Sequence, residues 1–231
     1  SKRHGATGFY DLIDEGYLPE AIINYIALLG WCPKDNQEIF TLKELEKAFD
    51  ISGISKSPAV FDYDKLSWFN GEYIKAMTPE KFTEVAMPYY KKVFGDKQMP
   101  YEKFAAILQK RTTQLTQIPE MLDFFAELPS YTKELFVNKK SKTNLENSPV
   151  VLKEAYDRLK AMPEWNETSI HDCLINMAVE KELKNGTVMW PVRIAAAGKT
   201  VTPGGAVEIL DILGRDESLA RLEKGMAILA E

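Results

Sequence analysis

The chain has 231 residues, 45% of them hydrophobic, so it is long enough to bury a core in one or two domains. Its formal net charge of −5 argues against a broad affinity for nucleic acid, which proteins with a large basic face have. Because it shows no run of 18 apolar residues, no apolar leader and no Cys–His cluster, we expect no membrane span, no secretory signal and no structural zinc site.

The first seven residues, Ser1–Thr7, carry two cations, a hydroxyl and a glycine. Lys and Arg supply charge and glycine lets backbone N–H groups approach phosphate oxygens, so the segment is equipped to bind a polyphosphate. The alternative is a solvated basic terminus, as most short Lys/Arg clusters are. No strand precedes the segment to hold it over a nucleotide, so we expect the rest of any such active site to lie outside this chain.

Three helices are predicted in the first third of the chain. The first covers residues 19–30 between a proline and a glycine, and the others follow caps at Thr41 and Asp62. Their apolar stripes are Ile22, Ile26 and Leu29; Leu42, Leu45 and Phe49; and Leu66, Phe69 and Tyr73. The pair Asn70-Gly71 could instead form a hairpin turn, but its flanks do not alternate cleanly, so a helix is favoured.

Residues 78–94 are predicted to form a helix that Gly95 stops, and Pro100 opens the next one. The apolar face of that next helix is predicted to be Phe104, Leu108, Leu115 and Ile118. Arg111 falls on the same face, where a guanidinium has to snorkel, pair with an acid, or meet an anionic or polar ligand. A buried Arg–carboxylate pair and a ligand contact both stay open.

The polar run 138–142 is predicted to be a loop that is either solvated or in contact with a phosphate backbone. Further helices are predicted from Pro119, over residues 148–162, and after a cap at residues 168–169. His171 lies off the apolar stripe of the last helix, to which Cys173 belongs, and no second His is near it in the sequence. We therefore interpret it as a structural or surface residue.

The stretch 189–205 is the second unusual segment. Pro191 and Gly198 are predicted to bracket a short helix, and Thr202 and Pro203 to supply the N-cap and first position of another. Two more glycines then follow in the predicted first turn, where each lowers the stability of the helix by about 1 kcal/mol relative to alanine. Bare amides there suit a phosphate or a base edge, while tight helix packing is the alternative.

Every long segment has the helical period of 3.6, and no Gly-rich phosphate loop follows a strand, so the chain is predicted to be all-α. Breaks are expected near residues 76–78 and 163–168. Counting basic and acidic residues gives 8 and 12 (−4) for 1–77, 14 and 12 (+2) for 78–165, and 7 and 10 (−3) for 166–231. A bound polyanion would therefore be held by selected positions and not by a broad basic face.

Several segments together resemble the bacterial glutamyl-tRNA synthetases, a family of class I aminoacyl-tRNA synthetases. SKRHGAT is similar to the end of the family's ATP-binding signature, K-[ML]-S-K-[SR], cut after its second position. The segments that match the family in its own order are GYLPEAIINYIALLGW, FDYDKLSWFNGEYI, WPVRIAAAGKTVTPGG and ILGRDESLARL. The Rossmann-type catalytic domain, which precedes the signature in the family, is expected to be missing from this chain.

The resemblance implies three helical units: a stem-contact region at 1–77, and anticodon-binding domains at 78–165 and 166–231. It also implies that the intact protein is a glutamate–tRNA ligase that uses ATP and magnesium, with Lys2 in contact with ATP. Without the catalytic domain, this chain alone is expected to be inactive and to hold no cofactor. We expect a cytoplasmic monomer that binds glutamate tRNA but neither DNA nor a membrane.

By the same resemblance, Arg111 is similar to the family arginine that reads the third anticodon base, where it suits cytosine and helps reject glutamine tRNA. The residues that fall where the family contacts the anticodon loop are Thr202, Pro203, Gly204 and Gly205. The family commonly has larger residues at the two glycines. Arg193 is a further candidate, for a backbone phosphate or the anticodon stack. Reading a few unstacked bases is the usual route to sequence-specific RNA binding.

The sequence therefore favours the tRNA-binding part of a glutamate–tRNA ligase. The alternative is a non-enzymatic helical protein–protein adaptor whose loops echo these motifs. A free-standing enzyme is disfavoured, because no nucleophile–base pair or metal cluster is visible in the sequence. Dependence of binding on the anticodon would separate the two readings.

Overall fold

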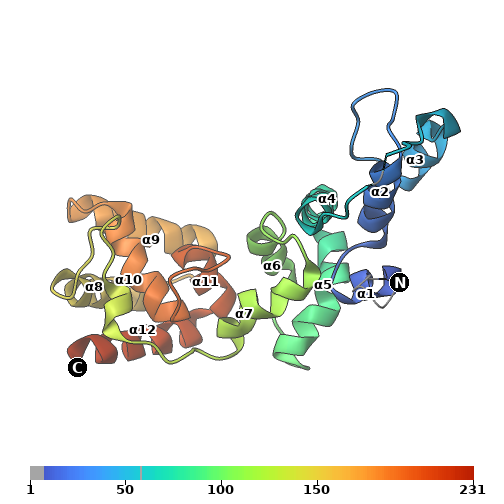
Figure 1. Cartoon of the computed structure of the whole chain (residues 1–231). Helices are drawn as coiled ribbons and strands as arrows, with labels where there is room; N and C mark the ends of the chain where they lie inside the picture. Colours follow the sequence, from blue (N-terminus) through green and yellow to red (C-terminus); the bar gives the residue numbers. More distant parts are fainter. Residues whose placement is uncertain (1–7, 58) are drawn as a thin grey trace. The chain divides into compact units, whose positions relative to one another are not determined.

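The computed structural model describes residues 8–57 and 59–231. Within these ranges the chain forms twelve α-helices and three 3₁₀ helices, and no β-strand beyond two isolated bridges (Figure 1). The predicted all-α class is confirmed. No helix in the same ranges is long and apolar enough to cross a bilayer.

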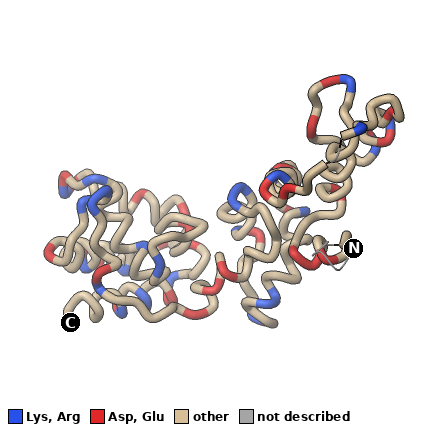
Figure 2. The backbone as a smooth tube through the Cα atoms, in the orientation of Figure 1, with Lys and Arg blue, Asp and Glu red and all other residues tan. Residues whose placement is uncertain are grey.

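Backbone contacts divide the chain into two compact units. The first takes Ser1–Gly95 and Phe104–Glu120, and the second takes Asp96–Lys103 and Met121–Glu231. Basic and acidic residues are interspersed along the backbone of each unit (Figure 2). The division into a stem-contact region and two anticodon-binding domains stays a prediction.

The helices of the first unit before its final segment are α1 (Phe9–Asp14), α2 (Pro19–Gly30), α3 (Leu42–Ala48), η2 (Ile51–Gly53), α4 (Tyr63–Ala76) and α5 (Pro79–Phe94). The caps predicted at Thr41 and Asp62 form, and Thr78 caps α5 in the same way: each of the three side chains accepts a backbone N–H of the first turn. One cluster of its core consists of Leu12, Tyr17, Ile22, Tyr25, Leu66 and Phe69. Asn70-Gly71 lies inside α4, so the helical alternative was right.

The predicted apolar stripe of α2 is wrong at Ile26, which is 48% exposed. The helix instead turns Asn24 and Tyr25 inward. Tyr25 joins the core, and Asn24 exchanges hydrogen bonds with the backbone of Glu38 and Phe40 at 2.9 and 2.8 Å. A polar residue is buried there because the loop after α2 needs partners for its backbone groups.

The helix predicted from Pro100 to Ile118 is wrong, because α6 (Tyr101–Leu108) ends at Leu108. The backbone N–H groups of Arg111 and Thr112 both donate to the Leu108 carbonyl, as does the Thr112 hydroxyl, at 2.8 to 2.9 Å. Threonine side chains that bind nearby carbonyls compete with helix propagation in this way. The chain continues through η3 (Leu115–Gln117) into α7 (Ile118–Ala126), so Arg111 lies on a turn.

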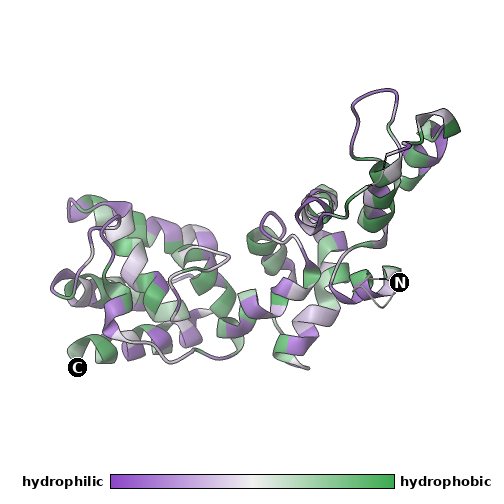
Figure 3. Cartoon of the chain, in the orientation of Figure 1, coloured by the Kyte–Doolittle hydropathy of each residue, from purple (hydrophilic) through white to green (hydrophobic). Residues whose placement is uncertain are grey.

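The second unit is built around α10. Its elements after α7 are η4 (Lys133–Phe136), α8 (Asn147–Ala161), α9 (Glu167–Glu180), α10 (Asn185–Ala197), α11 (Ala206–Leu213) and α12 (Arg215–Ala230). Helix α10 packs against α8, α9, α11 and α12. A Cβ on Gly225 would lie 2.6 Å from that of Ala195, so α12 approaches α10 closely. Most helices here combine hydrophobic and hydrophilic residues (Figure 3), as expected for helices with one buried face.

Three predicted helix boundaries in the second unit are wrong. Helix α10 runs through Pro191, with Gly198 as its left-handed C-cap, because burial along its length outweighs the missing donor. Helix α11 starts at Ala206 with Gly205 as N-cap, so residues 202–203 lie before the helix and do not cap it. The cap of α9 is Asn166.

Candidate nucleic-acid interface

The second unit has an open groove of about 470 Å³ between the loop after η4, helix α10 and the start of α11. Its lining residues are Lys140, Ser141, Gly186, Met189, Trp190, Arg193, Gly205 and Ala206. The groove thus joins two cations, an indole and exposed backbone, which is the mixture that single-stranded nucleic acid requires. Arg193 and Gly205, predicted separately from the sequence, both lie in it.

Arg193 and Trp190 form a stacked pair on one face of α10. The guanidinium carbon lies 4.6 Å from the centroid of the Trp190 ring. The Arg193 Nη2 donates to the Thr200 carbonyl at 2.9 Å, and the indole Nε1 donates to the Leu135 carbonyl at 2.9 Å. Both planar groups are therefore held in fixed orientations, and such surfaces suit an unstacked base.

The loop at the rim of the groove presents three lysines, Lys139, Lys140 and Lys142, all exposed. Asn138 and Thr143 exchange two backbone hydrogen bonds of 3.0 Å, which close the loop. Its carbonyl at Ser141 accepts a bond of 2.7 Å from the hydroxyl of Thr187 on α10. In the part of the chain that the structure describes, none of these three lysines has an ion pair, so their charge is available to phosphate.

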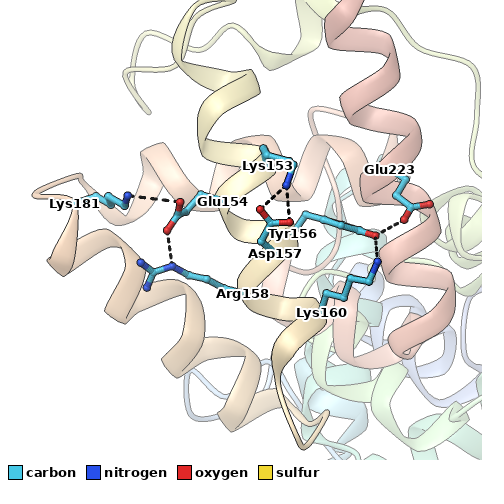
Figure 4. Close-up of polar contacts among 8 residues, drawn as sticks. All are labelled: Lys153, Glu154, Tyr156, Asp157, Arg158, Lys160, Lys181 and Glu223. Atoms are coloured by element: carbon cyan, nitrogen blue, oxygen red, sulfur yellow. Dashed lines mark hydrogen bonds and ion pairs between the residues drawn. The ribbon is translucent and has the colours of Figure 1, made fainter.

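The cations of helix α8 are arranged differently (Figure 4). Lys153 lies 2.6 Å from Asp157, and Glu154 is contacted by Arg158 at 2.9 Å and by Lys181 at 3.5 Å. These contacts lower the pKa of the Glu154 carboxyl, chiefly through the hydrogen bond from Arg158. The positive charge of α8 is therefore compensated within the unit, and this helix is a weaker candidate for binding a polyanion.

The segment before α11 is mostly buried. Thr202, Pro203 and Gly204 are buried, and the Thr202 hydroxyl donates to the Gly204 carbonyl at 2.6 Å. Among residues 202–205, Gly205 alone is exposed, and its N–H donates to the Glu208 carboxylate at 3.1 Å. The amide of Gly205 is thus not bare, whereas bare amides were expected at the two glycines of this helix start.

Arg111 lies on the first unit, on the turn after α6, where it is exposed and not sealed inside the core. Two side chains hold this turn against α4: Asn70 of α4 binds the Thr113 carbonyl at 2.6 Å, and Gln109 of the turn donates to the carbonyls of Ile74 and Met77 at 2.9 and 2.7 Å. The predicted ATP contact, Lys2, lies outside the described residues.

The sequence prediction missed Trp190 and left Lys140 undecided between solvent and phosphate. Trp190 and Arg193 are three residues apart, a spacing that places two side chains on one helix face. That signal was present in the sequence. The approach of Lys140 to the groove was not readable, because its loop and α10 are far apart in the chain.

Two family models match the sequence. The model described as anticodon binding domain matches residues 81–226, and the model described as tRNA synthetases class I (E and Q), catalytic domain, matches residues 1–68. The first match contains Arg111 and every residue of the groove. The second contains the segment in which the ATP-binding signature was found.

Glutamate–tRNA ligases are similar to the chain over nearly all of its length. Those of Clostridium kluyveri and Clostridium tetani are 50% and 49% identical over 226 residues, 98% of this chain but 46% of theirs. The solved structure of a glutamate tRNA ligase from Elizabethkingia meningosepticum has 30% identity and a TM-score of 0.80, covering 96% of this chain and 43% of that one.

The chain therefore spans about half the length of the relatives it matches. The resemblance to glutamyl-tRNA synthetases that its motifs indicated is confirmed by these identities. Because the first family match covers more than half of the sequence, the chain belongs to the anticodon binding domain family of tRNA synthetases.

Proposed function

We propose that this chain is the tRNA-binding part of a glutamate–tRNA ligase and that it binds the anticodon loop of glutamate tRNA. The observation that carries the proposal is the groove in which Lys140, Trp190, Arg193 and Gly205 meet. It combines a flat aromatic and guanidinium surface with a cation at the rim, and it lies inside the region matched by the anticodon binding model.

Within the groove, each group has a distinct task. The stacked Trp190 and Arg193 offer a surface for an unstacked anticodon base, and Lys140 neutralises a neighbouring phosphate. Gly205 leaves the start of α11 without a side chain, so that nucleotides can approach the backbone. The buried residues of the segment 202–204 hold this start in place instead of contacting RNA through their side chains.

On the first unit, we assign Arg111 to the third anticodon base, whose acceptor edge a guanidinium can bind. Its exposed position on a turn agrees with that role. The stretch 1–77 would contact the tRNA stem, and 78–165 and 166–231 would form two anticodon-binding domains.

The intact protein would join glutamate to its tRNA with ATP and magnesium, Lys2 would contact ATP, and the chain alone would be inactive. We expect a cytoplasmic monomer with no role for DNA. A protein–protein adaptor is not favoured, because the chain is similar to glutamate–tRNA ligases over 98% of its length.

Arg193→Ala tests the groove, with Arg215→Ala as a matched control. Arg215 also stands over an indole, at 5.9 Å from the Trp165 ring, and also donates to a backbone carbonyl, that of Met162. It does not line the groove. We expect Arg193→Ala to weaken binding of glutamate tRNA by about 1–3 kcal/mol, and Arg215→Ala to leave it unchanged.

Equal effects of the two substitutions would show that the stacked pair only stabilises the unit. No effect of Arg193→Ala, in a chain that binds glutamate tRNA, would remove the groove from the binding surface.

A further inference from the structure

Asn70 uses its whole side chain to bind backbone groups of two other segments. It is fully buried in α4. Its Oδ1 accepts from the Leu18 N–H at 2.8 Å, and its Nδ2 donates to the carbonyls of Gly16 and Thr113 at 3.3 and 2.6 Å. An amide offers one acceptor and two donors in a fixed plane, which is the set that these three backbone groups need.

The two segments that Asn70 binds also contact each other. The Leu115 N–H donates to the Gly16 carbonyl at 3.0 Å, and the Thr116 hydroxyl donates to the Glu15 carbonyl at 2.7 Å. Gly16 has a φ of 91°, and a Cβ there would lie 2.6 Å from the Thr116 nitrogen. The turn between α1 and α2 is therefore pressed against the segment that follows Arg111.

Asn70 stands between the two regions that the family models match. Gly16 and Leu18 belong to the region 1–68, and Thr113 to the region 81–226, while Asn70 lies in neither. Its side chain joins the two regions within one compact unit. Arg111 is two residues from the carbonyl that Asn70 holds.

We propose that Asn70 is a positioning residue for Arg111, fixing the turn that presents the guanidinium to the third anticodon base. The inference rests on the function proposed for Arg111. Releasing the Thr113 carbonyl frees the turn from α4, and the guanidinium then samples several positions instead of one. Misplacement of about 1 Å can cost a site as much as a hundredfold in its function.

The test measures binding of glutamate tRNA and of the same tRNA with a different third anticodon base. Asn70→Ser shortens the side chain and removes all three bonds. The matched control is Asn24→Ser, because Asn24 is equally buried in the same unit and binds Glu38, Phe40 and Tyr73, none of them in the Arg111 turn. We expect Asn70→Ser to reduce discrimination at the third base by about tenfold, and Asn24→Ser to leave it unchanged.

A double-mutant comparison distinguishes positioning from general destabilisation. If Asn70 acts through Arg111, then Asn70→Ser has no further effect on discrimination in an Arg111→Ala chain. Additive effects in that background, or a loss equal for both tRNAs, overturn the inference. If Arg111→Ala itself keeps full discrimination, the assignment of Arg111 and this inference fall together; if only Asn70→Ser keeps it, the inference alone falls.

If circular dichroism at the assay temperature shows that Asn70→Ser does not fold, Asn70→Asp replaces it in the same binding test. Its carboxylate has the same shape and still accepts from Leu18, but it no longer donates to Gly16 and Thr113. We expect the same loss of third-base discrimination, and full discrimination in a folded Asn70→Asp chain overturns the inference.

Discussion

The Arg193 guanidinium lies on the Trp190 ring and reaches across to the Thr200 carbonyl, 2.9 Å from its Nη2. One residue thus ties the face of α10 to the segment that leads to Gly205. The aromatic wall and the backbone opening of the groove are consequently held in one arrangement before any RNA arrives. Such preorganisation reduces the ordering cost of binding.

Trp190→Ala should weaken binding of glutamate tRNA by about 1–3 kcal/mol, because it removes the stacking surface for a base. Trp165→Ala is the control, since Trp165 also donates to a carbonyl, that of Leu210 at 3.1 Å, and also has an arginine beside it. Titration of each variant with fluorescently labelled tRNA measures the difference. Indistinguishable affinities of the two variants would exclude stacking on Trp190.

Lys140→Ala should weaken binding of all tRNAs alike and lower the slope of log K against log salt by about 1, because it deletes one phosphate contact. Lys153→Ala provides the comparison, since Asp157 already neutralises that lysine. Affinities measured at several salt concentrations give both slopes. An unchanged slope for Lys140→Ala would mean that this ammonium group does not contact phosphate.

The sequence allowed prediction of the fold class and of those caps that depend on local side chains. Asp62 caps α4 by accepting from the N–H groups of Asp64 and Lys65, at 2.9 and 3.2 Å. Such contacts join residues that are two or three positions apart, so the local sequence predicts them. The end of α6 was not predictable in this way. The Thr112 hydroxyl that binds the Leu108 carbonyl ends the helix locally, but the turn that follows is held by Asn70, whose bond to the Thr113 carbonyl spans 43 residues, and a helical period cannot reveal such a partner.

The site was predictable to a similar extent. Arg193 was found through the family resemblance and Gly205 first through its place in a predicted helix start, and the structure brings them together in one groove. The mistaken start of α11 came from reading Thr202 as a cap, whereas its hydroxyl binds the Gly204 carbonyl and forms a local turn. Threonine serves both purposes equally well, so the sequence alone did not decide between them.

Arg221→Met should lower the free energy of unfolding by about 3 kcal/mol or more, because Arg221 is 3% exposed and donates to the carbonyls of Phe124 and Ala196 at 2.7 and 2.9 Å. Urea titration measures the loss. Arg158→Met is the control, with partly exposed acidic partners and an expected cost of about 0–1 kcal/mol. Similar costs would show that the buried carbonyls find other donors.

The free energy of unfolding should fall between about pH 10 and pH 12, in part because the phenol of Tyr73 loses its proton more readily in the unfolded chain than in the folded chain. Burial, with the nearby charges of Glu20 and Glu44, raises the pKa of its phenol from 10.0 to about 12. The folded chain therefore keeps a proton that the unfolded chain releases, so this stability is fully present below pH 10 and is lost as pH rises through 12.

Between pH 9 and pH 11, Tyr73→Phe should lose less of its free energy of unfolding than the parent chain does, as measured by urea titration at each pH. Tyr10→Phe, which removes a phenol that is 80% exposed, should behave as the parent chain does. The same pH dependence in Tyr73→Phe and the parent would contradict the role of Tyr73.

Arg111→Ala should weaken binding of glutamate tRNA by about 1–3 kcal/mol and reduce discrimination at the third anticodon base. Lys110→Ala, on the same exposed turn, should affect all tRNAs equally. Competition between tRNAs that differ only in this base measures the ratio. A uniform loss in Arg111→Ala would make it a phosphate contact.

The most direct test of the account is the affinity of this chain for glutamate tRNA and for the same tRNA with its anticodon replaced, at one salt concentration. If the groove and Arg111 read anticodon bases, replacement should weaken binding at least tenfold, the effect of about 1.4 kcal/mol. Equal affinity for the two RNAs would contradict anticodon recognition by this chain.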